Sequence, residues 1–235
     1  MNHICPNKVP YASTVGSLMY AMLCTRPNIC YSVGVVSRYQ SNAGPKHWQA
    51  VKHILKYLRR TRNYMLVYQC EDLIPIGYTD SDFQSDLDFR KSTSGCVFTS
   101  GYGAISWRSV KQSCIVVSTL EVEYVVACEA AKEAVWLKKF LSDLGVMRME
   151  QVPITLFCDN IGAIAQSKYL RNHKKEKHIE RKYHIIQNIV AWRDVVVAKI
   201  DRANNLADPF TKALPQRTFE SHLEGMGVRL VHNSL

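Results

Sequence analysis

Two short apolar segments of this sequence each end in an aspartate. Ile74–Asp80 alternates β-branched and aromatic residues with small ones, and Pro153–Asp159 is similarly apolar. Both patterns are typical of buried β-strands. A carboxylate at the end of such a strand is poorly solvated, so it either caps its own turn or binds a cation. If the two strands are neighbours in one sheet, their carboxylates meet at the edge where α/β folds place their chemistry.

Further segments extend these two strands into one sheet. Gly95–Thr99 and Ala104–Trp107 flank a glycine-containing turn and predict a β-hairpin, and Val195–Asp201 predicts another strand. A long helix is expected over Thr119–Leu144, and a last helical region is expected from Leu206 toward residue 228. A hairpin extended by strands that follow helical crossovers gives an α/β fold, a mixed five-stranded sheet flanked by helices.

The first 70 residues differ from the rest in charge and in periodicity. They contain nine of the 30 basic residues and none of the 20 acidic ones. Three helices are expected there, over Ser13–Cys24, Asn28–Ser37 and Pro45 to about Arg60. We therefore divide the chain into a basic helical segment, residues 1–70, a sheet domain, residues 71–220, and a C-terminal tail, residues 221–235.

The third expected helix carries an apolar stripe and a group of basic residues. The apolar stripe consists of Trp48, Val51, Ile54, Leu55 and Leu58. The basic residues lie mostly off this stripe and are Lys52, Lys56, Arg59 and Arg60. The stripe indicates packing. A segment without acids favours a polyanionic partner, above all nucleic acid, although a solvated helical face is the alternative.

Composition indicates a folded protein in a reducing environment. Hydrophobic residues make up 47% of the chain and charged residues 21%, which excludes a disordered composition. No apolar run reaches membrane-spanning length and no secretory signal is evident, so no membrane partner is expected. The eight cysteines form no CxxC pair and are read as small buried residues. An intracellular location follows as an expectation.

Two glutamates near the start of the long helix have different expected roles. Ser118 and Glu121 have capping-box spacing, so Glu121 is read as structural. Glu123 has no capping role. It lies in line with Ala127 and Ala130, small residues that let a helix pack closely on a sheet, so we expect Glu123 to face the sheet edge as a ligand.

Asp208 completes a possible set of four carboxylates. By itself, an aspartate before Pro209 favours a helix N-cap. Beside the other acids it becomes a fourth candidate, and the catalytic and metal-binding residues predicted are Asp80, Glu123, Asp159 and Asp208. Oxygen ligands suit Mg²⁺, with Mn²⁺ as an alternative. Two such ions about 3.5–4 Å apart can activate a water and stabilise the leaving oxygen of a phosphodiester.

A second basic segment, Lys168–Arg193, supplies positive charge for a substrate backbone. It contains His173, His178 and His184, but no cysteine lies near them in sequence, which disfavours a closed zinc site. We interpret the histidines as part of a structural or nucleic-acid-facing helix. His173, in the loop before that helix, is a candidate for assisting proton transfer.

Seven stretches occur in the order and spacing of a known family. They resemble the ribonuclease H domain of copia-type LTR retrotransposon polyproteins, and they read GYTDSD, RKSTSG, GAISW, STLEVEY, CDN, KHIERKYH and LADPFTKAL. The front section resembles the segment that joins the reverse transcriptase to that domain. The likeness extends from about Pro10 to Phe219.

The resemblance implies a ribonuclease H-like fold with a two-Mg²⁺ site that cleaves the RNA of an RNA–DNA hybrid. The family motifs place its four acids at Asp80, Glu123, Asp159 and Asp208. Contacts to 2′-hydroxyl groups would select the ribonucleotide strand. The implied partners are the hybrid or another nucleic acid and a reverse transcriptase polymerase domain, and the implied location is the cytoplasm or the nucleus.

The sequence also departs from the family pattern. Asp82-Phe83-Gln84-Ser85 replaces a common DW-A-G stretch, and Asn28 replaces an acid in the TRPNI stretch. Neither change affects the four acids. No YVDD-type polymerase motif is present, so we expect a fragment of a retrotransposon reading frame. The alternatives are a non-catalytic nucleic-acid-binding remnant and a degenerate, poorly folded remnant.

Overall fold

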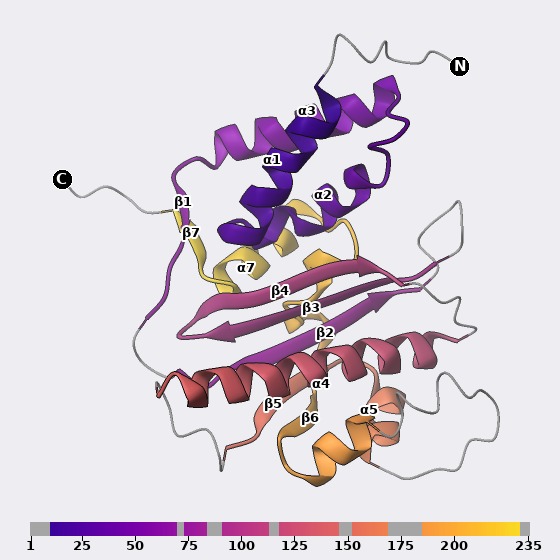
Figure 1. Ribbon diagram of the computed structural model, residues 1–235, viewed down its shortest axis with the longest axis vertical. Helices are drawn as coiled ribbons and strands as arrows, with labels where there is room; N and C mark the ends of the chain where they lie inside the picture. The colour runs from indigo at the N-terminus through magenta and orange to yellow at the C-terminus, as the bar shows by residue number, and fades with distance from the viewer. Residues whose placement is uncertain are drawn as a thin grey trace.

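A five-stranded mixed sheet forms the centre of the molecule (Figure 1). The computed structural model describes residues 10–69, 73–83, 91–112, 118–145, 152–168 and 185–230. The strand order is β4-β3-β2-β5-β6, with bounds β2 Ile76–Asp82, β3 Thr93–Ser100, β4 Gly103–Lys111, β5 Ile154–Cys158 and β6 Val195–Lys199. β3 is antiparallel to β2 and β4, whereas β2, β5 and β6 are parallel. The expected α/β class, a mixed five-stranded sheet flanked by helices and preceded by a helical segment, is confirmed.

The long helix α4, Thr119–Asp143, runs along one face of the sheet (Figure 1). The Ser118 side chain accepts a hydrogen bond from the Glu121 backbone N–H at 3.2 Å, which confirms the expected N-cap. A row of buried alanines lets the helix lie close to the strands, namely Ala127, Ala130, Ala131 and Ala134. Phe98 and Leu156 of the sheet pack against them. This packing fixes the direction in which the first turns of α4 point.

Smaller helices complete the sheet domain. α5, Ile161–Lys168, follows β5, and residues 185–191 are helical before β6. These segments pack in the same core cluster as α4, where Ile164, Ile186 and Ile189 are buried. The residues His173, His178 and His184 lie outside the described part of the chain, as does most of the basic segment Lys168–Arg193.

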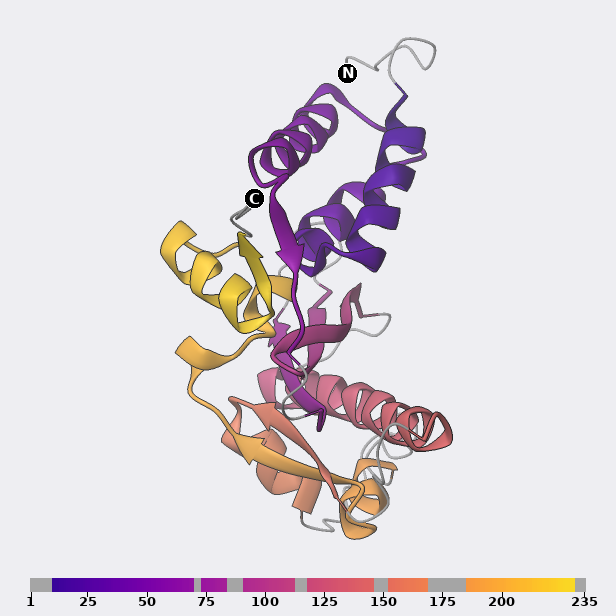
Figure 2. The ribbon, with the colours of Figure 1, turned by 90° about the vertical axis from the view of Figure 1, so that its left-hand side faces the viewer.

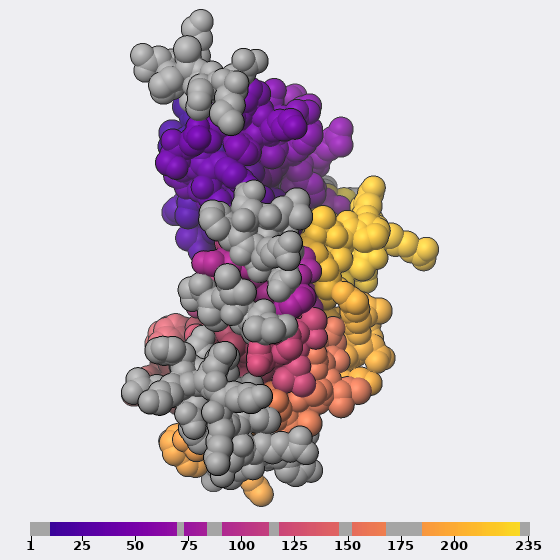
Figure 3. All heavy atoms as spheres, turned by 90° about the vertical axis from the view of Figure 1, so that its right-hand side faces the viewer, coloured from indigo at the N-terminus to yellow at the C-terminus, as the bar shows by residue number. Residues whose placement is uncertain are grey.

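The front segment forms a helical layer on the other side of the sheet. Its elements are α1 Tyr11–Cys24, η1 Pro27–Ile29, α2 Cys30–Ser37 and α3 Pro45–Arg60. Figure 2 shows this layer stacked above the sheet, and Figure 3 shows it at one end of the molecule. Val15, Val33 and Val51 are fully buried in its own core. The expected stripe on α3 is correct except at Leu55, which is 40% exposed.

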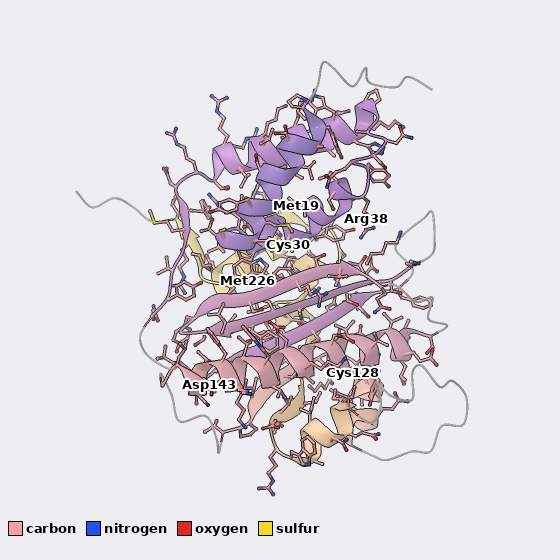
Figure 4. The ribbon with its side chains drawn as sticks, in the orientation of Figure 1. Met19, Cys30, Arg38, Cys128, Asp143 and Met226 are labelled. Carbon is pink, nitrogen blue, oxygen red and sulfur yellow. The ribbon has the colours of Figure 1, made fainter. Side chains whose placement is uncertain are left out.

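Several contacts join the front segment to the sheet domain. Cys30 and Met226 share a buried cluster with Phe210. Figure 4 labels Cys30 on α2 and Met226 between this helix and β4. The indole N–H of Trp107 on β4 donates a hydrogen bond to the Met22 backbone carbonyl at 2.8 Å. The front helices are therefore packed on the sheet and not merely connected to it.

The two ends of the described chain also pair with each other. β1, Tyr64–Leu66, and β7, Val228–Leu230, form a two-stranded antiparallel sheet. Helix α7, Gln216–Gly225, leads into β7. Residues assigned to the expected C-terminal tail thus contact residues of the front segment, and the division at residues 70 and 220 stays a prediction.

The last helical region differs from expectation. Asp208–Phe210 forms a single 3₁₀ turn, η4, shortly after another, η3 Arg202–Asn204, and α7 begins only after Pro215. A proline disfavours helical geometry in the residue before it, which explains the break. Ala207, not Asp208, is at the N-cap of η4, and Asp208 is the first residue of the turn.

Among the residues that the structure describes, no helix is both long enough and apolar enough to cross a membrane.

Candidate active site

Neighbouring parallel strands bring two of the predicted acids together. Thr79 on β2 is the register partner of Cys158 on β5, so Asp80 and Asp159 follow at the same end of the two strands. Asp80 is 2% exposed, and Asp159 is partly buried. Burial, followed by the negative charge of Asp80, raises the pKa of the Asp159 carboxyl. The expected convergence of the two strand ends is therefore present.

Glu123 reaches the same place from α4. Its side chain is 7% exposed, and its Oε2 atom has no hydrogen-bond partner among the described residues. Burial and then the charge of Asp80 raise the pKa of Glu123 to about 8, although hydrogen bonds from Ser81 oppose the shift. A buried carboxyl oxygen without a partner is costly, and a cation bound there would remove the cost.

Asp208 joins the cluster because η4 docks against the sheet. The Asn205 side-chain amide donates to the Thr79 backbone carbonyl at 2.8 Å, and the Ser109 hydroxyl donates to the Phe210 carbonyl at 2.6 Å. Gly95 on β3 makes the approach possible, since a Cβ atom there would lie 2.8 Å from Phe210 Cβ. These three contacts hold the η4 turn over the end of β2.

The docked Asp208 is strongly influenced by Asp80. Asp208 is 5% exposed, and burial followed by the Asp80 charge raises its pKa to about 6. The structure thus brings all four predicted acids, Asp80, Glu123, Asp159 and Asp208, into one electrostatically coupled cluster. Their function as ligands stays a prediction.

Two residues of the same cluster were not assigned a role from the sequence. Lys212 Nζ lies 3.1 Å from Asp80 Oδ2 and 3.0 Å from Asp208 Oδ1. The Thr211 hydroxyl donates a hydrogen bond to Asp80 Oδ2. Both residues belong to the LADPFTKAL stretch, and their positions three and four after Asp208 would have placed them beside it on a helical turn.

The donor atoms at the other side of the cluster favour a hard cation. Single donor atoms of Glu123, Cys158 and Asp159 lie within 4.8 Å of one another. Burial, and then the charge of Glu123, raises the pKa of the Cys158 thiol to about 12, so the sulfur is neutral and a poor ligand. The remaining donors are carboxylate oxygens, the type that Mg²⁺ and Mn²⁺ accept. The residues present therefore fit the predicted metal.

Positive charge and a cavity adjoin the acids. The charge of exposed Arg202 opposes the raised pKa of both Asp159 and Asp208. A cavity of about 310 Å³ lies between the front helices and the segment after η4, and its lining includes Tyr31, His53, Tyr57, Lys212 and Phe219. The four candidate bases on α3, Lys52, Lys56, Arg59 and Arg60, are all exposed.

Comparison with known proteins gives several relatives. A retrovirus-related Pol polyprotein from transposon TNT 1-94 of Nicotiana tabacum is 48% identical over 221 residues, 94% of this chain and 16% of that protein. The Pol polyprotein from transposon RE1 of Arabidopsis thaliana is 34% identical over 94% of this chain and 15% of its own length. A protein named secreted RxLR effector protein 161, from Plasmopara viticola, is 45% identical over 55% of this chain and 92% of its own length.

Other comparisons are weaker. No protein-family model matches the chain. Among solved structures, the ribonuclease H1 LC11, isolated from compost, is 20% identical with a TM-score of 0.43, over 64% of this chain and 99% of that one. The chain spans only about a sixth of the length of the transposon polyproteins that it matches.

Proposed function

The chain belongs to the family of retrovirus-related Pol polyproteins of copia-type transposons, and on that premise we propose that its four-carboxylate cluster cleaves the RNA strand of RNA–DNA hybrids. The family membership rests on identity over nearly the whole chain. The activity itself is a proposal, because this chain covers only about a sixth of the length of those relatives. The substrate class fits a cluster of acids at a sheet edge beside exposed basic residues.

Divalent cations complete this proposal. Asp80, Glu123 and Asp159 would hold one Mg²⁺ ion, and Asp80 and Asp208 would hold a second. When bound there, the ions would lower the pKa of a water molecule and stabilise charge on the leaving oxygen of a phosphodiester. The carboxylates themselves position the ions and balance their charge.

The protein's own residues would bind and orient the substrate. Exposed Arg202 lies close enough to Asp159 and Asp208 to influence both, so it is suited to a phosphate entering the site. The basic residues on α3 would contact a more distant part of the backbone. Contacts to 2′-hydroxyl groups would then decide which strand is cleaved.

One observation carries the proposal: Glu123 Oε2 is buried without a hydrogen-bond partner among the described residues, beside other acids. A purely structural role would leave this cost uncompensated, since a capping or ion-paired glutamate satisfies both of its oxygens. The matched neighbour is Glu121, in the first turn of the same helix.

Cleavage of a labelled RNA–DNA hybrid in Mg²⁺ tests the proposal. We expect the wild-type chain and Glu121→Gln to release cut RNA, and Asp80→Asn to release none. A wild-type chain that unfolds cooperatively but cuts no hybrid in Mg²⁺ or Mn²⁺ would contradict the proposal. Activity that persists in Asp80→Asn would show that the nuclease is a contaminant or uses another site.

A second candidate function is nucleic-acid binding without catalysis. It is favoured by Lys212, whose ion pairs already neutralise part of the charge on Asp80 and Asp208. Tight binding of the hybrid without cleavage in either metal would support this alternative. An intracellular location, in the cytoplasm or the nucleus, and association with a polymerase domain go with either proposal.

A further inference from the structure

Lys212 occupies an unusual position inside the carboxylate cluster. Its ammonium group lies 3.1 Å from Asp80 Oδ2 and 3.0 Å from Asp208 Oδ1, so it bridges two acids from different elements. The side chain is 18% exposed, and those of Asp80 and Asp208 are 3% and 7% exposed. The bridge is therefore largely shielded from water. Buried ion pairs are screened less than exposed ones, so this bridge is stronger than a surface pair.

The Lys212 ammonium group and a divalent cation bound by Asp80 and Asp208 would occupy the same position between the two carboxylates. Both require carboxylate oxygens at short range, and Asp80 Oδ2 already takes the Lys212 ion pair and the Thr211 hydrogen bond. A cation placed between Asp80 and Asp208 would also be repelled by the ammonium. Lys212 and a second metal ion therefore exclude each other from this half of the cluster.

The other half of the cluster is not blocked in this way. Donor atoms of Glu123 and Asp159 lie within 4.8 Å of each other, and the Oε2 atom of Glu123 has no partner among the described residues. Within the described part of the chain, Lys212 forms its ion pairs with Asp80 and Asp208. One divalent ion can therefore bind between Glu123 and Asp159 while Lys212 stays where it is.

Lys212 also has space to leave its place. It lines the cavity of about 310 Å³ that extends between the segment after η4 and the front helices, alongside Tyr31 and Tyr57. A lysine carries its charge on a flexible four-carbon stem, and a phosphate group is an alternative anionic partner. A substrate phosphate arriving at the cluster would offer the ammonium a new partner and free the Asp80–Asp208 pair.

We propose that Lys212 is a built-in cation that occupies the Asp80–Asp208 half of the cluster until substrate binds. The substrate-free protein then binds one divalent ion tightly, and a second enters only when Lys212 has moved. This inference rests on the proposed function, because it takes the four carboxylates to be the metal site. It assigns Lys212 a positioning role, since it acts through the acids and the metal.

Counting Mn²⁺ ions bound by the substrate-free chain tests the proposal. The amount of free Mn²⁺ is measured by electron paramagnetic resonance during titration of wild type, Lys212→Gln and Lys132→Gln. The control Lys132 is also ion-paired, to Glu129 at 3.2 Å, but on the exposed side of α4. We expect one tight ion for wild type and the control and two for Lys212→Gln, with the second-site affinity raised at least tenfold.

The outcomes separate this inference from the proposed function. Equal ion numbers in wild type and Lys212→Gln, whether one or two, would overturn the role of Lys212 and leave the metal site standing. Absence of Mn²⁺ binding in both would remove the metal site itself. The number of Mn²⁺ ions bound by wild type tests the inference even if Lys212→Gln does not fold. Two tightly bound ions in the substrate-free wild type would overturn it.

Discussion

Replacing Glu123 with glutamine should stabilise the metal-free protein at neutral pH. The pKa of Glu123 is raised from 4.5 to about 8 by burial and by Asp80. Between these two values the folded state holds a proton that the unfolded state has released. The free energy of unfolding therefore falls as pH rises through this window, and Glu123→Gln removes that contribution.

The size of the effect follows from the shift. At pH 7 the carboxyl of Glu123 is still mostly protonated in the folded state. In the unfolded state it is ionised, because pH 7 is about 2.5 units above its ordinary pKa of 4.5. At about 1.4 kcal/mol per unit, the cost to the folded state is about 3 kcal/mol. Most of the cost develops between pH 5 and pH 8. A glutamine at position 123 does not ionise, so the folded state of Glu123→Gln does not carry this cost.

Urea unfolding followed by circular dichroism measures this difference. Wild type, Glu123→Gln and the control Glu121→Gln are compared in EDTA at pH 5.5, 7 and 8. We expect the free energy of unfolding of Glu123→Gln to exceed that of wild type by about 3 kcal/mol at pH 7 and about 4 kcal/mol at pH 8, and by less at pH 5.5. Glu121→Gln should stay within about 0.5 kcal/mol of wild type.

Metal should reverse the order. With Mg²⁺ in excess over its dissociation constant, wild type is stabilised by mass action, whereas Glu123→Gln has lost a ligand. The reasoning is refuted if Glu123→Gln is no more stable than wild type in EDTA at pH 8, or if the difference between them does not change with pH.

Further predictions concern the metal and the packing around the site. Added Mg²⁺ should raise the thermal midpoint of wild type more at pH 8 than at pH 5.5, measured by calorimetry, because protons compete for the same carboxylates; an equal rise at both values would contradict this. Gly95→Ala should cost about 1–3 kcal/mol in urea unfolding, since its Cβ would press on Phe210; an unchanged midpoint would show that η4 adapts. Trp107→Phe should cost about 1 kcal/mol through loss of its hydrogen bond to Met22, and unchanged stability would show that this contact does not join the two layers.

Much of the fold could be predicted because it depends on local patterns. The hairpin around residues 101–102, the strand that ends near Asp80 and the N-cap at Ser118 are all encoded within a few neighbouring residues. The contrast between Glu121 and Glu123 also followed from spacing on one helix. The structure brings the four predicted acids together, and their role as ligands is still a prediction.

Other features could not be read locally. The last helix was expected to begin near Asp208, but docking of η4 on Gly95 and the break at Pro215 produced a separate turn. The pairing of β1 with β7 joins segments from the two ends of the described chain. Neither feature leaves a periodic signal in the sequence, because each depends on surfaces that meet only after folding.

The sequence by itself determined which residues are acids at the ends of strands and on the first turns of α4. Tertiary structure decided that β2 and β5 are neighbours, that Glu123 Oε2 lies buried without a partner in the described chain, and that Lys212 bridges Asp80 and Asp208. Lys212 and Asp80 are 132 positions apart. Electrostatic interactions depend on distance in space and on burial, so only the packed chain could set the charge balance of this site.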